Sequence, residues 1–262
     1  MICAGIDAGS RAIKIVLLET DGLEVRGSGK TDQGTDQDDR AQRLLDRLLA
    51  ENGLARSDLA RTVATGYGRN IIGSADTTVT EITCHARGVR HVLPDTATIV
   101  DIGGQDSKII KLHESGAVRD FAMNDRCAAG TGCFLEMVAR KLDVPLDELG
   151  RLASRSRERV AISNVCVVFA ETEIIGLLAD GAAAEDIVAG VQAAVAGRIA
   201  TMAGRKVSSP TALTGGVALV SGMDQALSRV LGQPVRIAPE PQMTGALGAA
   251  LLAADGAGRD RR

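Results

Sequence analysis

The chain has 262 residues, 45% of them hydrophobic and 24% charged, with a formal net charge of −3. This composition suits a globular protein with one large core or two lobes, and the absence of a basic run argues against a nucleic-acid partner. No signal-peptide pattern or membrane-spanning apolar stretch is present, and five cysteines, an odd number, argue against a disulfide framework. We therefore expect a cytoplasmic protein without a membrane partner.

The first predicted elements form a hairpin around a turn of small residues. An apolar strand that contains Asp7 runs into Gly9 and Ser10, and a β-branched strand leaves the turn. Glycine lets backbone N–H groups approach a phosphate closely, and the Ser10 hydroxyl adds a donor. A plain hairpin turn is the simpler interpretation of one such motif alone.

The same pattern returns at residues 98–110. One constant offset aligns four pairs of residues: Asp7 with Asp101, Gly9 with Gly103, Lys14 with Lys108, and Gly22 with Gly116. This repeat predicts two lobes built on one plan, which could hold a triphosphate from both sides of a cleft. Asp7 and Asp101 are candidate Mg²⁺ partners, acting through water. Lys14 and Lys108 are interpreted as residues on the strand faces rather than phosphate ligands.

The segment between the hairpins is predicted to contain a helix over residues 81–92. Its His85 is interpreted as a half-buried structural histidine, and neither Glu81 nor Arg69 is given a chemical role.

Two cysteines follow the second hairpin. Cys127 lies in a loop before a helical pattern at residues 134–139, and Cys166 precedes a helix expected over about 170–178. Exposed N–H groups at a helix N-terminus favour a thiolate or an anionic cluster. Neither cysteine belongs to a C-x₂-C pair, so one chain lacks the usual spacing of a site with four thiolates, whereas two copies would supply four ligands. Two buried free thiols are the alternative interpretation.

The last predicted elements are a strand from residue 211 that ends at Gly215 and Gly216, and a helix over about 245–257 that begins at Gly245. The paired glycines would admit the face of an adenosine ring, although ordinary turn glycines are the alternative. Residues 1–92 are expected to form lobe I, with the last helix packed back on it. Residues 93–244 are expected to form lobe II.

The paired hairpins and the later Gly-Gly loop resemble the acetate kinase, sugar kinase, Hsp70 and actin superfamily. That resemblance implies an α/β, two-lobed, actin-like (ribonuclease H-like) ATPase fold with duplicated lobes. The blocks ATGYGRN at 64–70, DIGGQD at 101–106 and NDRCAAGTG at 124–132 are similar to the BadF/BcrA-type family. This family comprises the activator ATPases (component A) of 2-hydroxyacyl-CoA dehydratases and the ATPase subunits of benzoyl-CoA reductase.

The family resemblance implies a homodimer bridged by one [4Fe–4S] cluster, with Cys127 and Cys166 of each subunit as ligands. Cys133 is expected not to be a ligand, and Cys3 and Cys84 are expected to be packing thiols. The residues expected to bind ATP or ADP are Gly9, Ser10, Gly103, Gly104, Gln105, Gly130, Gly132, Gly215, Gly216 and Gly245.

The implied activity is ATP hydrolysis coupled to one-electron transfer. A ferredoxin or flavodoxin would reduce the cluster, and the electron would pass to a separate dehydratase or reductase that carries the acyl-CoA. Asp7 and Asp101 with Mg²⁺, and Gln105 orienting the water, are the expected catalytic residues, with Asp106 as a rival of Gln105. A benzoyl-CoA reductase subunit is the alternative within the family. An actin-fold small-molecule kinase and a nucleotide switch without a cluster are alternatives of other classes.

Overall fold

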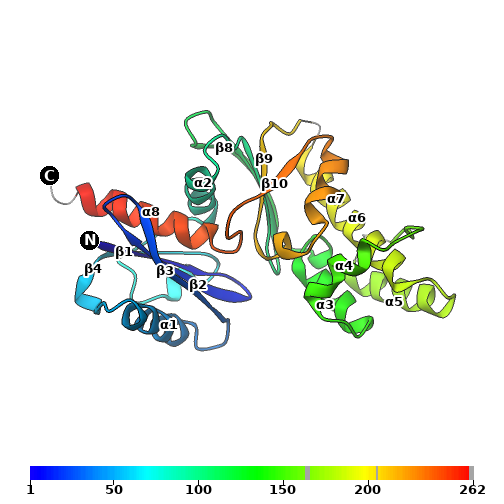
Figure 1. The fold of residues 1–262 in the computed structure, drawn as a ribbon, viewed down its shortest axis with the longest axis horizontal. Helices are drawn as coiled ribbons and strands as arrows, with labels where there is room; N and C mark the ends of the chain where they lie inside the picture. The colour runs from blue at the N-terminus through cyan, green and yellow to red at the C-terminus, as the bar shows by residue number, and fades with distance from the viewer. Residues whose placement is uncertain (163–165, 205, 260–262) are drawn as a thin grey trace. The chain divides into compact units, whose positions relative to one another are not determined.

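The computed structural model describes residues 1–162, 166–204 and 206–259, and its contacts divide the chain into two units. Unit 1 contains Met1–Pro94, Glu114–Val118 and the residues from Gln242 onward, whereas unit 2 contains Asp95–His113 and Arg119–Pro241. Each unit is built on one five-stranded sheet with helices packed on it (Figure 1).

The sheet of unit 1 has the strand order β3-β2-β1-β4-β5. Its central strand, β1, pairs antiparallel with β2 and parallel with β4. The strands are β1 (Ile2–Ala8), β2 (Ala12–Glu19), β3 (Glu24–Asp32), β4 (Leu59–Thr65) and β5 (Thr77–Thr78), and the helices are α1 (Gln37–Glu51), α2 (Glu81–Val92) and α8 (Thr244–Arg259).

Two helices cover opposite faces of this sheet because successive side chains of a strand point to opposite sides. Ile13, Ile15 and Leu17 of β2 pack in one core with the buried leucines of α1. Val16 and Leu18, which alternate with them, pack with α8. The face that α8 covers is therefore closed by the last helix of the chain, against which α2 also packs (Figure 1).

Glycines allow α8 to lie unusually close to its neighbours. A Cβ atom on Gly5 of β1 would overlap the backbone of Ala246 and Ala250 in α8. Gly88 of α2 meets the backbone of Thr244 in the same way, and Gly248 of α8 meets that of Cys84. Part of the high glycine content therefore serves backbone-to-backbone packing rather than flexibility.

The sheet of unit 2 has the order β10-β9-β6-β7-β8. Read from its other end, this order repeats that of unit 1: a strand pairs antiparallel with the next strand in the chain and parallel with a later one. The strands are β6 (Thr98–Ile102), β7 (Ser107–Leu112), β8 (Val118–Asn124), β9 (Thr211–Thr214) and β10 (Val235–Ile237). The sequence repeat thus coincides with a repeat of topology.

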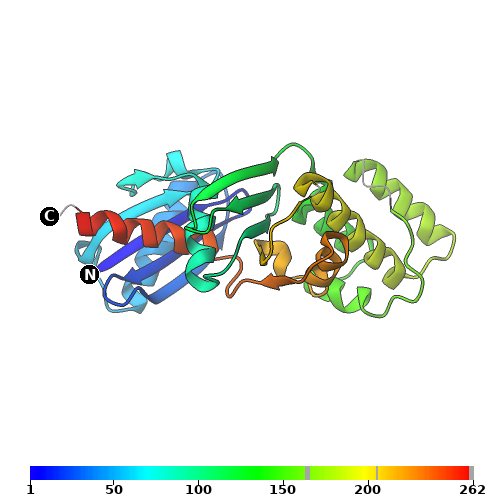
Figure 2. The ribbon, with the colours of Figure 1, turned by 90° about the horizontal axis from the view of Figure 1, so that it is seen from above.

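The helices of unit 2 gather on one side of its sheet (Figure 1, Figure 2). Val100 and Ile102 of β6 share a core with Phe134 and with the buried side of α6. The helices are α3 (Gly132–Lys141), α4 (Leu149–Ala153), α5 (Val167–Ala179), α6 (Ala184–Ala203) and α7 (Met223–Leu231). No helix among the described residues is both long and apolar enough to cross a bilayer.

Candidate functional site: two Asp–Lys hairpins and a cysteine loop

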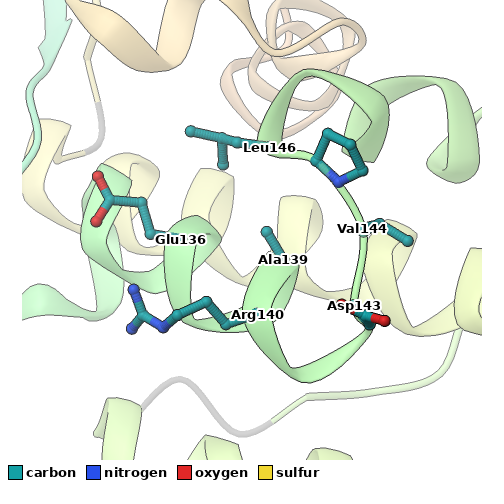
Figure 3. A pocket seen from close by; sticks show the side chains of 7 residues that line it. Glu136, Ala139, Arg140, Asp143, Val144 and Leu146 are labelled. Atoms are coloured by element: carbon teal, nitrogen blue, oxygen red, sulfur yellow. The ribbon is translucent and has the colours of Figure 1, made fainter.

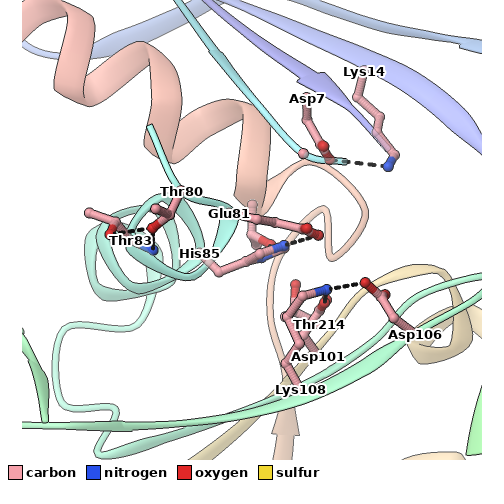
Figure 4. Close-up of polar contacts among 12 residues, drawn as sticks. Asp7, Lys14, Thr80, Glu81, Thr83, His85, Asp101, Asp106, Lys108 and Thr214 are labelled. Carbon is pink, nitrogen blue, oxygen red and sulfur yellow. Dashed lines mark hydrogen bonds and ion pairs between the residues drawn. The ribbon is translucent and has the colours of Figure 1, made fainter. Parts of the chain in front are cut away.

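The first hairpin brings a carboxylate and an ammonium group together at the end of β1. Asp7 lies directly opposite Lys14 in the β1–β2 register, and directly opposed residues of a strand pair present their side chains on the same face. Lys14 Nζ accordingly donates to Asp7 Oδ2 at 3.1 Å (Figure 4). The Asp7 side chain is almost fully buried, whereas that of Lys14 is 18% exposed.

The second hairpin repeats this pairing in a more buried form. Asp101 lies opposite Lys108, and Lys108 Nζ contacts Asp106 Oδ2 at 2.8 Å and Asp101 Oδ2 at 3.4 Å (Figure 4). Only 1% of the Lys108 side chain is exposed. Both lysines therefore point toward the carboxylates that are predicted to bind Mg²⁺ through water. The equal spacing of seven residues across both tight turns is the sequence signal that indicates this pairing.

Asp7 has an unused oxygen that fits a bound Mg²⁺ ion. Among the described residues, its buried Oδ1 has no hydrogen-bond partner, and such an orphan acceptor requires an explanation. A Cβ atom on Gly66 would lie 2.5 Å from Oδ1, and Gly66 adopts a φ of +88°. Arg69 Nη1 donates to the Gly66 carbonyl at 3.1 Å. Sequence reasoning gave this loop no role, but it borders the predicted metal partner.

A buried polar chain lies beside Asp7 in the same unit. His85 Nδ1 and Thr244 Oγ1 share a hydrogen bond of 3.0 Å, and His85 Nε2 lies 3.6 Å from Glu81 Oε1. A Cβ atom on Gly245 would lie 3.3 Å from His85 Nε2 and 3.2 Å from Asp7 Oδ2. Gly245, predicted to bind nucleotide, therefore permits the close approach of His85 and Asp7. His85 is buried rather than half-buried as predicted.

The turn residues of both hairpins lie at the strand ends. Gly9 donates its N–H to the Ala12 carbonyl at 3.2 Å, and Gly103 donates to the Asp106 carbonyl at 2.9 Å. Ser10 is partly exposed in the first turn, as is Gly104 in the second, and Gln105 is exposed. These positions leave the polar groups of both turns accessible to a ligand.

The predicted adenosine loop adjoins the second hairpin. Gly215 has a φ of +87°, and a Cβ atom there would overlap the Ile102 carbonyl and lie 2.8 Å from Asp101 Oδ1. Its N–H donates to the Pro241 carbonyl at 2.9 Å. A Cβ atom on Gly216 would have open space within 4 Å. Only Gly215 is thus required by the packing of the chain, whereas Gly216 borders free volume.

Cys127 is held by one side chain in the loop after β8. Asn124 Nδ2 donates to the Cys127 carbonyl at 2.7 Å, and the Cys127 N–H donates to Asn124 Oδ1 at 3.2 Å. Cys127 caps the short 3-10 turn η3 (Ala128–Gly130), and α3 begins only at Gly132. Cys127 therefore lies before α3, as predicted, with the 3-10 turn η3 between them.

Cys166 directly precedes α5, whose first helical bond runs from the Ala170 N–H to the Cys166 carbonyl at 2.9 Å. The motif residues Ser163, Asn164 and Val165 lie outside the described residues. Cys127 and Cys166 are partly exposed, so both thiols are accessible to a metal.

The remaining cysteines differ in their surroundings. Cys3 and Cys84 are fully buried, and burial raises the pKa of the Cys84 thiol to about 12. Both are therefore poorly suited to supply a thiolate. Cys133 is partly exposed at the start of α3.

The two glycines of the cysteine loop differ in what they contact. The Gly132 N–H donates to the Gly103 carbonyl of the second hairpin at 2.9 Å. Gly130 lies against the stem of Arg198, since a Cβ atom there would be 3.3 Å from its Cγ and Cδ. Of the two, Gly132 is joined directly to the turn of the second hairpin.

A surface hollow of about 500 Å³ lies elsewhere on unit 2 (Figure 3). Glu136 and Arg140 project from α3 along it. The described residues that line it are Glu136, Ala139, Arg140, Asp143, Val144, Pro145 and Leu146. None of them is a site residue predicted from the sequence, and we assign the hollow no ligand.

Comparison with known proteins identifies the family. Residues 4–253 match the model of the BadF/BadG/BcrA/BcrD ATPase family. The 2-hydroxyisocaproyl-CoA dehydratase activator of Clostridioides difficile is 43% identical over 97% of this chain and 96% of its own length. A benzoyl-CoA reductase subunit of Thauera aromatica is 32% identical over 97% of this chain and 93% of its own length.

Solved structures give the same result. The activator of the 2-hydroxyisocaproyl-CoA dehydratase from Clostridium difficile with bound ADPNP matches 100% of this chain and 97% of its own, with a TM-score of 0.94 and 43% identity. A ROK hexokinase from Thermus thermophilus, 15% identical, covers 99% of this chain and 100% of its own with a TM-score of 0.56, and it shares the fold alone. The predicted actin-like ATPase fold is thereby supported, and the chain belongs to the BadF/BadG/BcrA/BcrD ATPase family.

Proposed function

We propose that this protein is an ATP-dependent activator that hydrolyses ATP and delivers single electrons to a 2-hydroxyacyl-CoA dehydratase. Family membership and the activator related at 43% identity support the ATPase and activator roles. The acceptor would be a separate protein that carries the acyl-CoA, and the donor a ferredoxin or flavodoxin. A cytoplasmic location suits free thiols, because the cytosol keeps them reduced.

The different surroundings of the cysteines carry the electron-transfer part of the proposal. Cys127 and Cys166, like Cys133, are partly exposed at the starts of helical turns, whereas Cys3 and Cys84 are sealed in the core. Two thiolates per chain fit a cluster with four thiolate ligands if two chains associate, so we propose a homodimer. A bound [4Fe–4S] cluster supplies reversible one-electron chemistry.

The proposed hydrolytic residues follow from the hairpins. Asp7 and Asp101 would hold the water shell of Mg²⁺, and the unpartnered Asp7 Oδ1 supports this role. Asp106 already receives a hydrogen bond from Lys108, whereas Gln105 is exposed in the turn. We therefore retain Gln105, rather than Asp106, as the residue that orients the attacking water.

The nucleotide contacts remain those expected from the glycine-rich turns. Backbone N–H groups near Gly9 and Gly103, together with the Ser10 hydroxyl, would donate to phosphate oxygens. The open space at Gly216 supports contact with the adenosine moiety.

Iron and sulfide analysis with EPR tests the proposal. On anaerobically purified and reconstituted protein we expect about four irons per two chains, with loss of the cluster in both Cys127→Ala and Cys166→Ala. The matched control is Cys133→Ala, which should keep the iron. Iron-free wild type that still hydrolyses ATP would contradict electron transfer and favour a nucleotide switch. Iron-free protein that phosphorylates a sugar or carboxylate would favour a kinase.

A role as the ATPase component of a benzoyl-CoA reductase is the second candidate, supported by the relative at 32% identity. Such a component would remain in a permanent complex with other chains. Size-exclusion chromatography of the native protein from its source separates the two functions, since an activator elutes without the acyl-CoA enzyme.

A further inference from the structure

The first amide groups of α3 are bonded to the second phosphate turn. Amides in the first turn of a helix lack intrahelical partners. Here the Gly132 N–H donates to the Gly103 carbonyl at 2.9 Å, and the Cys133 N–H donates to the Gly104 carbonyl at 2.8 Å. The N–H groups of this turn are proposed to face the phosphates. Its carbonyl groups accept hydrogen bonds from α3.

The same end of α3 is tied to the loop that carries Cys127. Thr131 is fully buried, and its N–H and Oγ1 both donate to the Ala128 carbonyl, at 3.1 and 2.8 Å. Asn124 holds both peptide groups of Cys127. The segment from Cys127 to Cys133 is thus hydrogen-bonded at both ends and in the middle.

The core fixes α3 next to this segment. Phe134 and Leu135 are fully buried and pack in one cluster with Ile102, which ends the strand before the turn. A displacement of the turn is therefore transmitted through well-packed groups rather than absorbed by loose ones.

Cys166 stands in a different position. No backbone hydrogen bond among the described residues joins Cys166 or α5 to Gly103 or Gly104. The two proposed cluster ligands of one chain thus differ in their connection to the second hairpin.

We propose that Cys133 is a positioning residue that acts through its backbone amide. Together with Gly132, it couples the Gly103 and Gly104 turn to the Cys127 loop, so that the nucleotide state changes the surroundings of Cys127 more than those of Cys166. This inference rests on the proposed ATP-binding function. It also gives Cys133 a role that does not depend on its thiol.

A pair of substitutions separates the amide from the thiol. Cys133→Pro removes the N–H that donates to Gly104, and proline is tolerated in the first turn of a helix. The residue before it is Gly132, whose lack of a Cβ atom removes one of the two clashes that restrict a residue before proline. Cys133→Ala removes only the thiol and is the matched control.

The experiment uses full-length, iron-free protein and measures thiol labelling by mass spectrometry of the peptides that contain Cys127 and Cys166. Labelling is compared with ADP and with a non-hydrolysable ATP analogue. In wild type and Cys133→Ala, we expect the labelling rate of Cys127 to differ by about fivefold between the two nucleotides, and that of Cys166 to differ less. In Cys133→Pro, the difference at Cys127 should disappear while nucleotide affinity persists.

The outcomes are distinct. An equal response of Cys127 in Cys133→Pro and Cys133→Ala would overturn the coupling. Wild type that binds neither nucleotide would instead overturn the proposed function. If circular dichroism shows that Cys133→Pro does not fold, hydrogen exchange of the Cys133 amide in wild type decides: a rate that changes between the two nucleotides supports the coupling, and an unchanged rate overturns it.

Discussion

Lys108 is an example of a charged side chain that the fold buries. Its ammonium group is almost fully buried and contacts two carboxylates, Asp101 and Asp106. Removing one partner of a buried ion pair costs more than the pair itself contributes, because the remaining charge stays desolvated. The equivalent Lys14 is partly exposed, although its partner Asp7 is about as buried as Asp101.

This difference predicts unequal costs for the same substitution. Lys108→Met should lower the free energy of unfolding by about 3 kcal/mol, since Asp101 and Asp106 lose their ammonium partner inside the protein. Lys14→Met, the matched control, should cost less, because it takes an ammonium partner from one carboxylate, Asp7, rather than from two. Urea unfolding of the two variants measures both values, and equal losses would contradict this argument.

The buried thiols should be chemically silent. Because burial raises the pKa of Cys84 to about 12, its thiolate is scarce below that pH, and the pKa of Cys3 is raised for the same reason. Iodoacetamide at about pH 8 should therefore modify Cys127 and Cys166 of the native iron-free protein and spare Cys3 and Cys84. Peptide mass spectrometry measures the labelling, and modified Cys84 in folded protein would refute this prediction.

The positions of single residues could be predicted where a local sequence pattern contains them. The repeat located Asp7 and Asp101, and loop position located Cys127 and Cys166. The bond between His85 and Thr244 joins residues 159 positions apart, and no local pattern contains such a contact. The proposed catalytic and ligand roles stay predictions.

At the scale of elements, the loop from Gly66 to Arg69 has no room for a side chain at its first residue. Gly66→Ala should cost about 3 kcal/mol of unfolding free energy, because the new Cβ combines a strained backbone with overlap at Asp7. Gly53→Ala is the control: its φ is +67°, but a Cβ there meets nothing within 4 Å. It should cost only about 1 kcal/mol. Thermal and urea unfolding measure both, and equal costs would contradict the overlap.

The start of α6 carries a pH-dependent contact. Asp186 Oδ1 accepts hydrogen bonds from the N–H groups of Glu158 and Arg157 and from the Ser156 hydroxyl, at 2.7 to 2.9 Å. These donors, Glu158 first, hold the pKa of Asp186 below its ordinary value. The carboxylate therefore stabilises the fold above the unfolded pKa of about 3.9, and this contribution is lost as the pH falls through the lowered value.

We expect Asp186→Asn to lower the urea midpoint at about pH 6 and to approach wild type near pH 3. Glu185→Gln removes a charge from the same helical turn and controls for the helix dipole. A deficit of Asp186→Asn that does not change with pH would exclude the carboxylate as its cause.

The helix boundaries show where the local sequence no longer determines the secondary structure. Residues 81–92 were predicted and observed as α2. In contrast, α3 and α5 begin earlier than predicted, at Gly132 and Val167. Glycine and β-branched residues are weak helix formers. The bonds from α3 to the second hairpin, which the sequence does not display, decide where that helix starts.

At the scale of the whole molecule, the number of chains is the property to measure. The proposed cluster, held by Cys127 and Cys166 of each chain, requires two copies of the 27.2 kDa chain. Anaerobic size-exclusion chromatography with light scattering should give twice this mass for the iron-loaded protein. Cys127→Ala should run as a single chain under the same conditions. A dimer that persists in the variant and after iron removal would show that association does not depend on the cluster.

The repeat was readable in the sequence because one offset aligns both hairpins, and the structure gives the two sheets the same strand order. The helices that distinguish the units were harder to predict. α6, for example, buries residues around most of its circumference, so it lacks the polar stripe from which an amphipathic helix is recognised.

The position of α8 has a consequence for synthesis on the ribosome. Unit 1 begins at the first residue but needs α8, from the other end of the chain, to cover one face of its sheet. Unit 2 is complete once Pro241 has been made. The polypeptide therefore emerges with its first sheet half-covered, and the half that is translated first is the last to finish folding.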